Sequence, residues 1–154
     1  MSKSLLAVAL KKLSSRAYSQ KELEKYLAKR NFSQAEIKEA ITKLQSWGYL
    51  NDQKLAMDWY MYYTNNKPHG YLYIYKKLQA KGISAEVISS LLEDYDQEKE
   101  LERARGLAEK FIANKAKQTQ QDKLKGMLAR HLYRKGFLQV NIMKILVEFF
   151  PDTI

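Results

Sequence analysis

The sequence predicts an all-α protein, an elongated and curved array of three tandem three-helix repeats. Leu, Ala, Lys, Glu and Gln, which are good helix formers, dominate the chain, and only 2 of its 154 residues are proline. One pattern of apolar residues and helix stops also occurs three times along the chain. Such self-similarity is typical of repeat architectures, in which each unit packs mainly on its neighbours and leaves long faces available to a partner.

The repeated pattern has seven positions, which in the first copy are Leu23, Leu27, Asn31, Phe32, Ile37, Ile41 and Leu44. Adding 51 to each number gives Ile74, Leu78, Gly82, Ile83, Ile88, Leu92 and Tyr95. Adding another 54 gives Leu128, Leu132, Gly136, Phe137, Ile142, Leu146 and Phe149. Every apolar position stays apolar, so the same local structure is predicted three times.

The third position of the pattern stands where a helix should end. It is occupied by Asn31, Gly82 and Gly136, and these residue types adopt the left-handed backbone conformation at the lowest cost. The apolar residue after each stop lies five positions before another apolar residue, which is the spacing of a hydrophobic staple around an N-cap. We therefore expect three helix stops, each followed closely by a new helix.

The new helices carry N-cap signals of unequal strength. Ser33 and Ser84 stand at the N-cap position of the first two copies, and Ser33 has Glu36 three residues later, which completes a capping box. Residues 19–22 (Ser-Gln-Lys-Glu) form another box upstream. Leu138 replaces the serine in the third copy, so that cap should be weaker.

Each junction is preceded by another apolar-periodic segment, which predicts three helices in every repeat. The predicted helices span residues 4–14, 20–30, 34–47, 53–65, 71–81, 85–94, 97–116, 122–135 and 139–149. The three repeats are expected at residues 1–50, 51–96 and 97–154.

Composition narrows the class of protein. The hydrophobic content of 45% predicts a packed core, and the net charge of +10 favours an acidic partner: nucleic acid, an anionic membrane or an acidic protein surface. Because the chain has no cysteine, it can form neither a disulfide nor a thiolate metal site. The apolar run at residues 5–10 is interrupted by lysines, and no stretch approaches the roughly 20 apolar residues of a membrane span. We expect a soluble cytoplasmic protein without a signal peptide.

Two stretches resemble motifs of the RecX family. Residues 48–56 (Gly-Tyr-Leu-Asn-Asp-Gln-Lys-Leu-Ala), followed by Trp59, resemble the first motif. In the family, this motif consists of a glycine, an apolar pair, an acidic or amide pair, and then a large apolar residue with alanine. Residues 70–83 resemble its glycine-initiated helix that ends in Lys-Gly-Ile, although residues 71–73 are Tyr-Leu-Tyr where the family commonly has proline and basic residues. The resemblance extends from about Leu6 to Phe149.

The resemblance implies a non-enzymatic regulator. A RecX protein is expected to bind in the helical groove of the RecA–DNA filament and to restrain RecA's ATP hydrolysis, strand exchange and co-protease activity. It would need no cofactor and would act as a monomer, with possible direct contact to DNA and none to a membrane. The alternative is a nucleic-acid-binding helical repeat protein that acts independently of RecA. A hydrolase or transferase is disfavoured because catalytic motifs are missing.

Basic residues near the ends of equivalent helices are the candidate partner-binding set. They are Lys29, Arg30, Lys76, Lys77, Lys81, Arg130, Arg134 and Lys135. Together they could form one basic face that pairs with phosphates or carboxylates. The alternative is that they are ordinary solvated helix residues.

Charge reverses sign between the basic regions, since residues 86–109 hold eight carboxylates against three basic residues. These acids could repel phosphate or contact basic residues of a partner. Alternatively, they form a solvated stretch with acids placed favourably near a helix start, which is the interpretation we favour.

Six tyrosines lie between residues 60 and 75. Helical spacing favours the core for Tyr71 and Tyr75, whereas Tyr73 is expected to be exposed and available for aromatic contact. His69 and His131 are expected to be surface residues, because neither has acidic or histidine neighbours at metal-ligand spacing. No glycine-rich phosphate loop is present, so neither metal nor nucleotide binding is expected.

Overall fold

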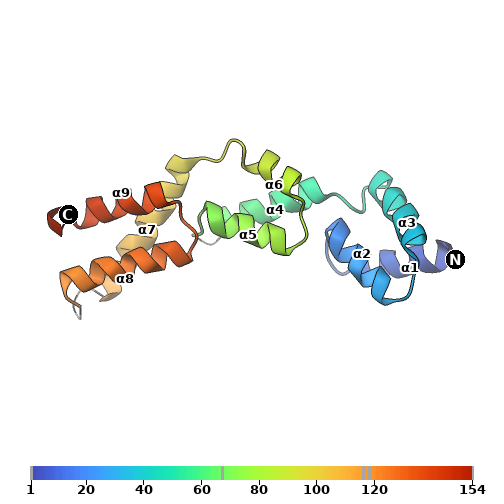
Figure 1. The fold of residues 1–154 in the computed structure, drawn as a ribbon, viewed down its shortest axis with the longest axis horizontal. Coiled ribbons are helices and arrows are strands. Elements are labelled where there is room, and N and C mark those ends of the chain that lie inside the picture. Colours follow the sequence, from blue (N-terminus) through green and yellow to red (C-terminus); the bar gives the residue numbers. More distant parts are fainter. Residues whose placement is uncertain (1, 67, 116, 118, 154) are drawn as a thin grey trace. The chain divides into compact units, whose positions relative to one another are not determined.

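The protein is described by a computed structural model that covers residues 2–66, 68–115, 117 and 119–153 (Figure 1). Within this part of the chain every regular element is helical, which confirms the all-α class. The elements are α1 (Ser2–Leu13), α2 (Gln20–Lys29), α3 (Gln34–Ser46), α4 (Asp52–Asn65), α5 (Tyr71–Ala80), α6 (Ala85–Leu92), α7 (Gln97–Lys115), α8 (Gln121–Arg134), α9 (Gln139–Phe149) and a short 3-10 helix, η2 (Pro151–Thr153). All nine predicted helices are found, with ends within two residues of the expected positions; the predicted end at residue 116 lies outside the described residues.

The three predicted helix stops are confirmed by their backbone conformation. Asn31, Gly82 and Gly136 have φ angles of 70°, 85° and 80°. After each stop, the next residue donates its backbone N–H to a carbonyl five residues earlier, as in Phe32 to Leu27 at 3.4 Å. This is the Schellman closure, which satisfies a carbonyl at the end of a helix.

The predicted N-caps are also present. The Ser33 hydroxyl accepts from the backbone N–H of Glu36 at 3.2 Å, and the capping box is complete. Ser19 forms the same box, and Ser84 accepts from the backbone N–H of Val87 at 3.3 Å. Leu138 caps α9 without a side-chain hydrogen bond, as expected.

The chain forms two compact units, and the division runs through α4 and α5. Unit 1 comprises Met1–Trp59 and Leu78–Glu93, and unit 2 comprises Tyr60–Lys77 and Asp94–Ile154. In unit 1, α1, α2 and α3 bury an aliphatic cluster that includes Leu5, Leu23, Leu27, Ile41 and Leu44. In unit 2, α7, α8 and α9 bury the equivalent cluster, which includes Ala104, Leu128, Leu132, Phe137 and Ile145.

Unit 1 contains a joint between the first repeat and the end of α5. We call it the first joint and define it as Ser19, Gln20, Asp52, Lys81 and Gly82. The buried Ser19 hydroxyl donates to the carbonyl of Lys81 at 2.5 Å, and the backbone N–H of Gln20 donates to the Asp52 carboxylate at 2.9 Å. A Cβ added at Gly82 would lie 2.8 Å from the Cβ of Lys21, so the N-terminus of α2 lies directly on the turn that ends α5.

Unit 2 contains the equivalent second joint, which we define as Gly70, Tyr71, Glu100, Lys135 and Gly136. The backbone N–H of Gly70 donates to the carbonyl of Lys135 at 3.0 Å, and that of Leu72 donates to the carbonyl of Gly136 at 2.9 Å. A Cβ added at Gly70 would lie 2.6 Å from the Gly136 carbonyl oxygen. The N-terminus of α5 thus lies on the turn that ends α8, backbone against backbone.

Candidate functional site

The eight basic candidates lie in the C-terminal halves of α2, α5 and α8 or directly after these helices. Three of them belong to unit 1, namely Lys29, Arg30 and Lys81, and five to unit 2, namely Lys76, Lys77, Arg130, Arg134 and Lys135. Six are exposed, whereas Lys81 and Lys135 are partly buried. Cations at helix C-termini interact favourably with the helix dipole, so this placement also stabilises the helices that carry them.

Aromatic rings hold three of these basic groups in place. The Arg30 guanidinium lies 4.5 Å from the centre of the Tyr26 ring, and the Lys81 ammonium lies 3.5 Å from that of Trp59. The Lys77 ammonium lies 5.3 Å from the centre of the Tyr73 ring. Such cation–π contacts orient a long side chain while the charge remains accessible at an exposed site.

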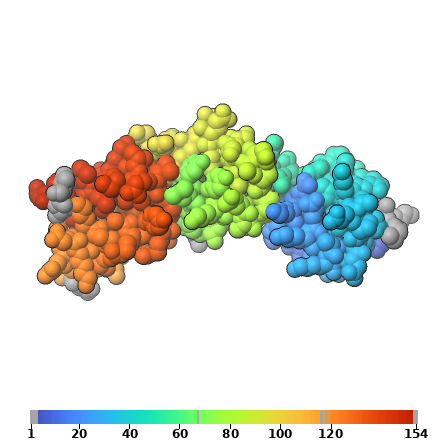
Figure 2. Space-filling view, viewed as in Figure 1, coloured from blue at the N-terminus to red at the C-terminus, as the bar shows by residue number. Residues whose placement is uncertain are grey.

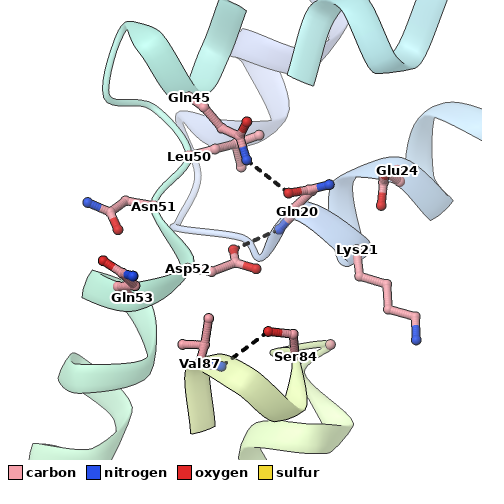
Figure 3. Close-up of a pocket in the computed structure, with 11 residues that line it drawn as sticks. Gln20, Lys21, Glu24, Gln45, Leu50, Asn51, Asp52, Gln53, Ser84 and Val87 are labelled. Carbon is pink, nitrogen blue, oxygen red and sulfur yellow. Dashed lines mark hydrogen bonds between the residues drawn. The ribbon is translucent and has the colours of Figure 1, made fainter. Parts of the chain in front are cut away.

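A polar cavity of about 580 Å³ lies at the first joint in unit 1 (Figure 3). Its wall carries Gln20, whose side-chain oxygen accepts from the Gln45 amide at 2.9 Å, and Asp52 beside it. Partial burial, and then the charges of Glu22 and Glu24, raise the pKa of the Asp52 carboxyl above its ordinary value. The cavity therefore has a hydrogen-bonded acidic wall, and the basic candidate residues do not line it.

Unit 2 contains a buried carboxylate that sequence reasoning missed. Glu100 is fully buried, although it belongs to the acidic stretch that we expected to be solvated. Its Oε1 accepts from the backbone N–H of Tyr71 at 2.7 Å and from the Tyr95 hydroxyl at 2.6 Å. Its Oε2 accepts from the backbone N–H of Leu138 at 3.0 Å and from the Asn141 amide at 2.5 Å. The solvated interpretation is therefore wrong for this residue.

The Glu100 carboxylate is satisfied by these four donors, because each oxygen accepts two hydrogen bonds. Burial and the Glu100 carboxylate raise the pKa of Tyr95, which keeps its hydroxyl protonated as a donor. Arg103 donates to the same hydroxyl at 2.8 Å and to the carbonyl of His69 at 3.1 Å. Through this network, Glu100 on α7 satisfies backbone N–H groups at the starts of α5 and α9. The role of the network is therefore structural. The sequence signal was Asn141 at the N3 position of α9, where the capping boxes carry a glutamate that accepts from the N-cap N–H.

The predictions for Tyr73 and His69 were wrong. His69 is buried and stacks on Tyr73, with ring centres 3.7 Å apart and planes inclined by 16°. Tyr63 packs edge-on against both rings, at 5.9 Å from His69 and 5.6 Å from Tyr73. Tyr73 is thus a partly buried member of an aromatic cluster, because its backbone lies against Gly136 at the second joint. Tyr71 and Tyr75 are also partly buried.

His131 is likewise not a simple surface residue. It is partly buried and stacks on Phe111, with ring centres 4.9 Å apart. Burial, followed by the charges of Lys135 and Arg134, lowers its pKa below the ordinary value. Burial and the two neighbouring cations thus favour the neutral imidazole.

Within 2–66, 68–115, 117 and 119–153, no three His, Asp or Glu side chains are grouped so that they could hold a metal ion. In the same ranges, no helix is both long enough and apolar enough to cross a membrane.

Comparison with known proteins decides the family. Residues 6–44 match the profile of the domain described as "RecX, first three-helix domain". Regulatory protein RecX of Pelodictyon phaeoclathratiforme is 34% identical over 132 residues, which cover 86% of this chain and 80% of that protein. The chain belongs to the RecX family. Regulatory protein RecX of Bacillus subtilis is 33% identical over 129 residues, and the match spans only 48% of its length.

Solved RecX structures share the fold of this RecX-family chain. The crystal structure of RecX from Lactobacillus salivarius matches with a TM-score of 0.87 and 26% sequence identity, over 96% of this chain and 95% of that one. A second crystal structure, of regulatory protein RecX, matches with a TM-score of 0.81 at 21% identity and supports the fold alone. The tandem three-helix architecture is thus that of the family, whose named members are regulatory proteins.

Proposed function

We propose that this chain binds the RecA–DNA filament and restrains RecA's ATP hydrolysis, strand exchange and co-protease activity. It would act as a non-enzymatic, cofactor-free regulator of DNA repair and recombination, as a monomer in the cytoplasm. Several weak contacts from successive repeats would add through multivalency, and bridging of neighbouring subunits would oppose filament motions. Its repeats would follow the boundaries 1–50, 51–96 and 97–154.

The observation that carries this proposal is the placement of exposed basic side chains at equivalent helix ends in a RecX-family chain. Lys29, Lys76, Lys77, Arg130 and Arg134 are all exposed, and none takes part in a salt bridge among the residues that the structure describes. Such groups supply long-range attraction to an acidic partner. The non-enzymatic part of the proposal is supported by the Glu100 network, whose carboxylate is saturated by structural donors.

The test is RecA ATPase activity on single-stranded DNA, titrated with this chain. We expect inhibition at substoichiometric amounts, and we expect it to be lost when Lys76, Lys77, Arg130 and Arg134 are all changed to Glu. A matched control reverses the same number of exposed lysines elsewhere, at Lys11, Lys99, Lys110 and Lys115. The control should still inhibit, because it changes the net charge equally and leaves the C-terminal ends of α2, α5 and α8 intact.

Two results would contradict the proposal. One is absence of inhibition by the unchanged chain although filament formation is confirmed. The other is equal loss of inhibition in the control variant, which would show that net charge matters and position does not. Tight binding to RecA-free DNA that falls steeply with salt would instead favour the direct nucleic-acid-binding alternative.

A further inference from the structure

The third repeat differs from the other two at four matching surface positions. These positions hold Ala28, Ala35, Lys38 and Thr42 in the first repeat, Gln79, Glu86, Ser89 and Glu93 in the second, and Tyr133, Val140, Met143 and Val147 in the third. All of these residues are exposed. Because two repeats fold with small or polar side chains at these positions, folding of a repeat does not require apolar ones. The apolar residues of the third repeat therefore need another explanation.

The four apolar side chains form one surface across α8 and α9. Val140, Met143 and Val147 follow each other at helical spacing on α9, and each is about half exposed, while Tyr133 on α8 is 69% exposed. Between the two helices lies a groove of about 510 Å³, lined by Tyr133, Met143 and the apolar edge of Ile142. Figure 2 shows α8 in orange and α9 in red side by side on the surface of unit 2. We call this surface the α8–α9 face.

Positive charge borders the groove. Arg130 and Arg134, one turn apart on α8, both line it and both are exposed. Within the described part of the chain, no salt bridge involves either arginine. Glu148 of α9 is occupied elsewhere, since it pairs with Arg105 at 2.9 Å. The groove thus combines an apolar wall with two guanidinium groups that lack a carboxylate partner.

This combination favours one kind of occupant over two others. Nucleic acid would use the arginines, but three aliphatic side chains on α9 offer nothing to a phosphate backbone. A second copy of the chain, related by a twofold axis, would bring Arg130 and Arg134 of both copies together and cause like-charge repulsion. A protein segment with a large apolar side chain between carboxylates would fill the groove and pair with the guanidinium groups bidentately.

We propose that the α8–α9 face of the third repeat is a docking site for an acidic protein segment that inserts a large apolar side chain beside Tyr133 and Met143. That the segment belongs to the filament protein, and not to another partner, rests on the function proposed above. The chemistry of the site does not depend on that function. The third repeat thereby recognises protein, while the basic helix ends of the other repeats remain available to other acidic groups.

A first experiment tests the chemistry without RecA. The isotope-labelled chain is titrated, with NMR detection, with a synthetic acidic peptide that has a central leucine and phenylalanine flanked by glutamates. We expect shifts confined to α8 and α9. They should be absent with the same peptide carrying serine at both apolar positions, and in the Met143→Lys variant. No shift with the leucine–phenylalanine peptide, or equal shifts with the serine peptide, would overturn the proposal.

A second experiment uses filaments and a variant that separates protein from nucleic acid. Met143→Lys places a charge against the apolar side chain that the groove would receive, so it should weaken a protein contact, whereas the same charge should strengthen a DNA contact. We expect filament affinity to fall by about tenfold, a typical effect for a central interface residue. The matched control is Met57→Lys on α4, because Met57 is 46% exposed against 50% for Met143. The control should change affinity by less than about twofold.

The remaining outcomes are equally decisive. Tighter binding of an oligonucleotide by Met143→Lys, with the α8 and α9 signals shifted by that oligonucleotide, would assign the face to nucleic acid and overturn the proposal. A dimer of the unchanged chain in sedimentation that Met143→Lys dissociates would assign it to a second copy. If the peptide shifts α8 and α9 but the chain does not bind RecA filaments, the proposed function fails and the docking site stands.

Discussion

The two joints solve the same packing problem with different chemistry. In both, the N-terminus of a middle helix (α2 or α5) lies on the left-handed turn that ends the next middle helix. An acid from the first helix of the next repeat (α4 or α7) accepts from the first backbone N–H of that middle helix. The first joint uses a serine hydroxyl and a partly exposed aspartate. The second uses direct backbone hydrogen bonds from Gly70 and a fully buried glutamate with four donors.

The difference shows that a repeat conserves geometry more strictly than it conserves contacts. Where the helix N-terminus carries Ser19, the side chain reaches the Lys81 carbonyl. Where it carries Gly70, the missing Cβ lets the two backbones meet, and the Gly70 N–H itself bonds the Lys135 carbonyl. Because the second joint is tighter and more deeply buried, we expect it to tolerate substitution less well than the first.

The largest effect should come from Gly136→Ala. Gly136 has a φ of 80°, and a Cβ there would overlap the backbone of Tyr73. A left-handed alanine costs about 1–2 kcal/mol and the overlap about 2 more, so we expect the free energy of unfolding of unit 2 to fall by about 3–4 kcal/mol. Gly48→Ala is the control, since its φ is 83° with nothing within 4 Å of the added Cβ, and it should cost only the about 1–2 kcal/mol of a left-handed alanine.

Amide hydrogen exchange of α5 and α8 measures this effect in unit 2. Tryptophan fluorescence reports unit 1 alone, since Trp47 and Trp59 are the only tryptophans and both lie there. Equal costs for Gly136→Ala and Gly48→Ala would mean that the close approach at the second joint contributes nothing to stability.

The next largest effect is expected for Glu100→Gln. The substitution keeps the shape of the side chain but replaces one acceptor oxygen by an NH₂ group that faces donors in a buried site. We expect a loss of about 3 kcal/mol, with faster exchange of the Tyr71 and Leu138 amides. Glu102→Gln, an exposed position on the same helix, should be close to neutral. If the Tyr71 and Leu138 amides exchange at the same rate in both variants, the buried carboxylate does not stabilise the second joint.

Ser19→Ala tests the first joint. Ser19 and Ser33 form the same capping box, but Ser19 is buried and also donates to the Lys81 carbonyl, whereas Ser33 is exposed. We therefore expect Ser19→Ala to lower the free energy of unfolding of unit 1 by about 2 kcal/mol, and Ser33→Ala to lower it by about 1 kcal/mol. The free energy of unfolding of unit 1, followed by tryptophan fluorescence in urea, measures the difference. A larger cost at Ser33 would mean that the hydrogen bond across the first joint is not stabilising.

The smallest effect is a pH dependence at the first joint. The folded protein raises the pKa of Asp52 above its value in the unfolded chain, mainly through burial. The folded state therefore binds the proton more tightly, so this group favours folding most below its unfolded pKa, and the contribution is lost as pH rises through the folded pKa. Carbon NMR of the Asp52 carboxyl should give a pKa above 3.8. A value at or below 3.8 would contradict the burial that the first joint imposes.

Much of the local structure followed from the sequence. The helix stops at Asn31, Gly82 and Gly136, the capping boxes at Ser19 and Ser33, and the weak cap at Leu138 were all predicted and confirmed. These features depend on residues a few positions apart, where residue type nearly determines the conformation. The partner-binding role of the basic set remains a prediction that the filament experiments test.

The tertiary structure alone decided the rest. The sequence predicted helix stops at Gly82 and Gly136, but only the fold shows that a neighbouring helix leaves no room for a Cβ at either position. The third stop, Asn31, is exposed. The burial of Glu100 has the same origin, because three of its four donors come from residues 29, 38 and 41 positions away. Local patterns determine where helices begin and end, since backbone preferences and caps act over single turns. Contacts between distant segments depend on how helices pack, and only the folded chain brings those groups together.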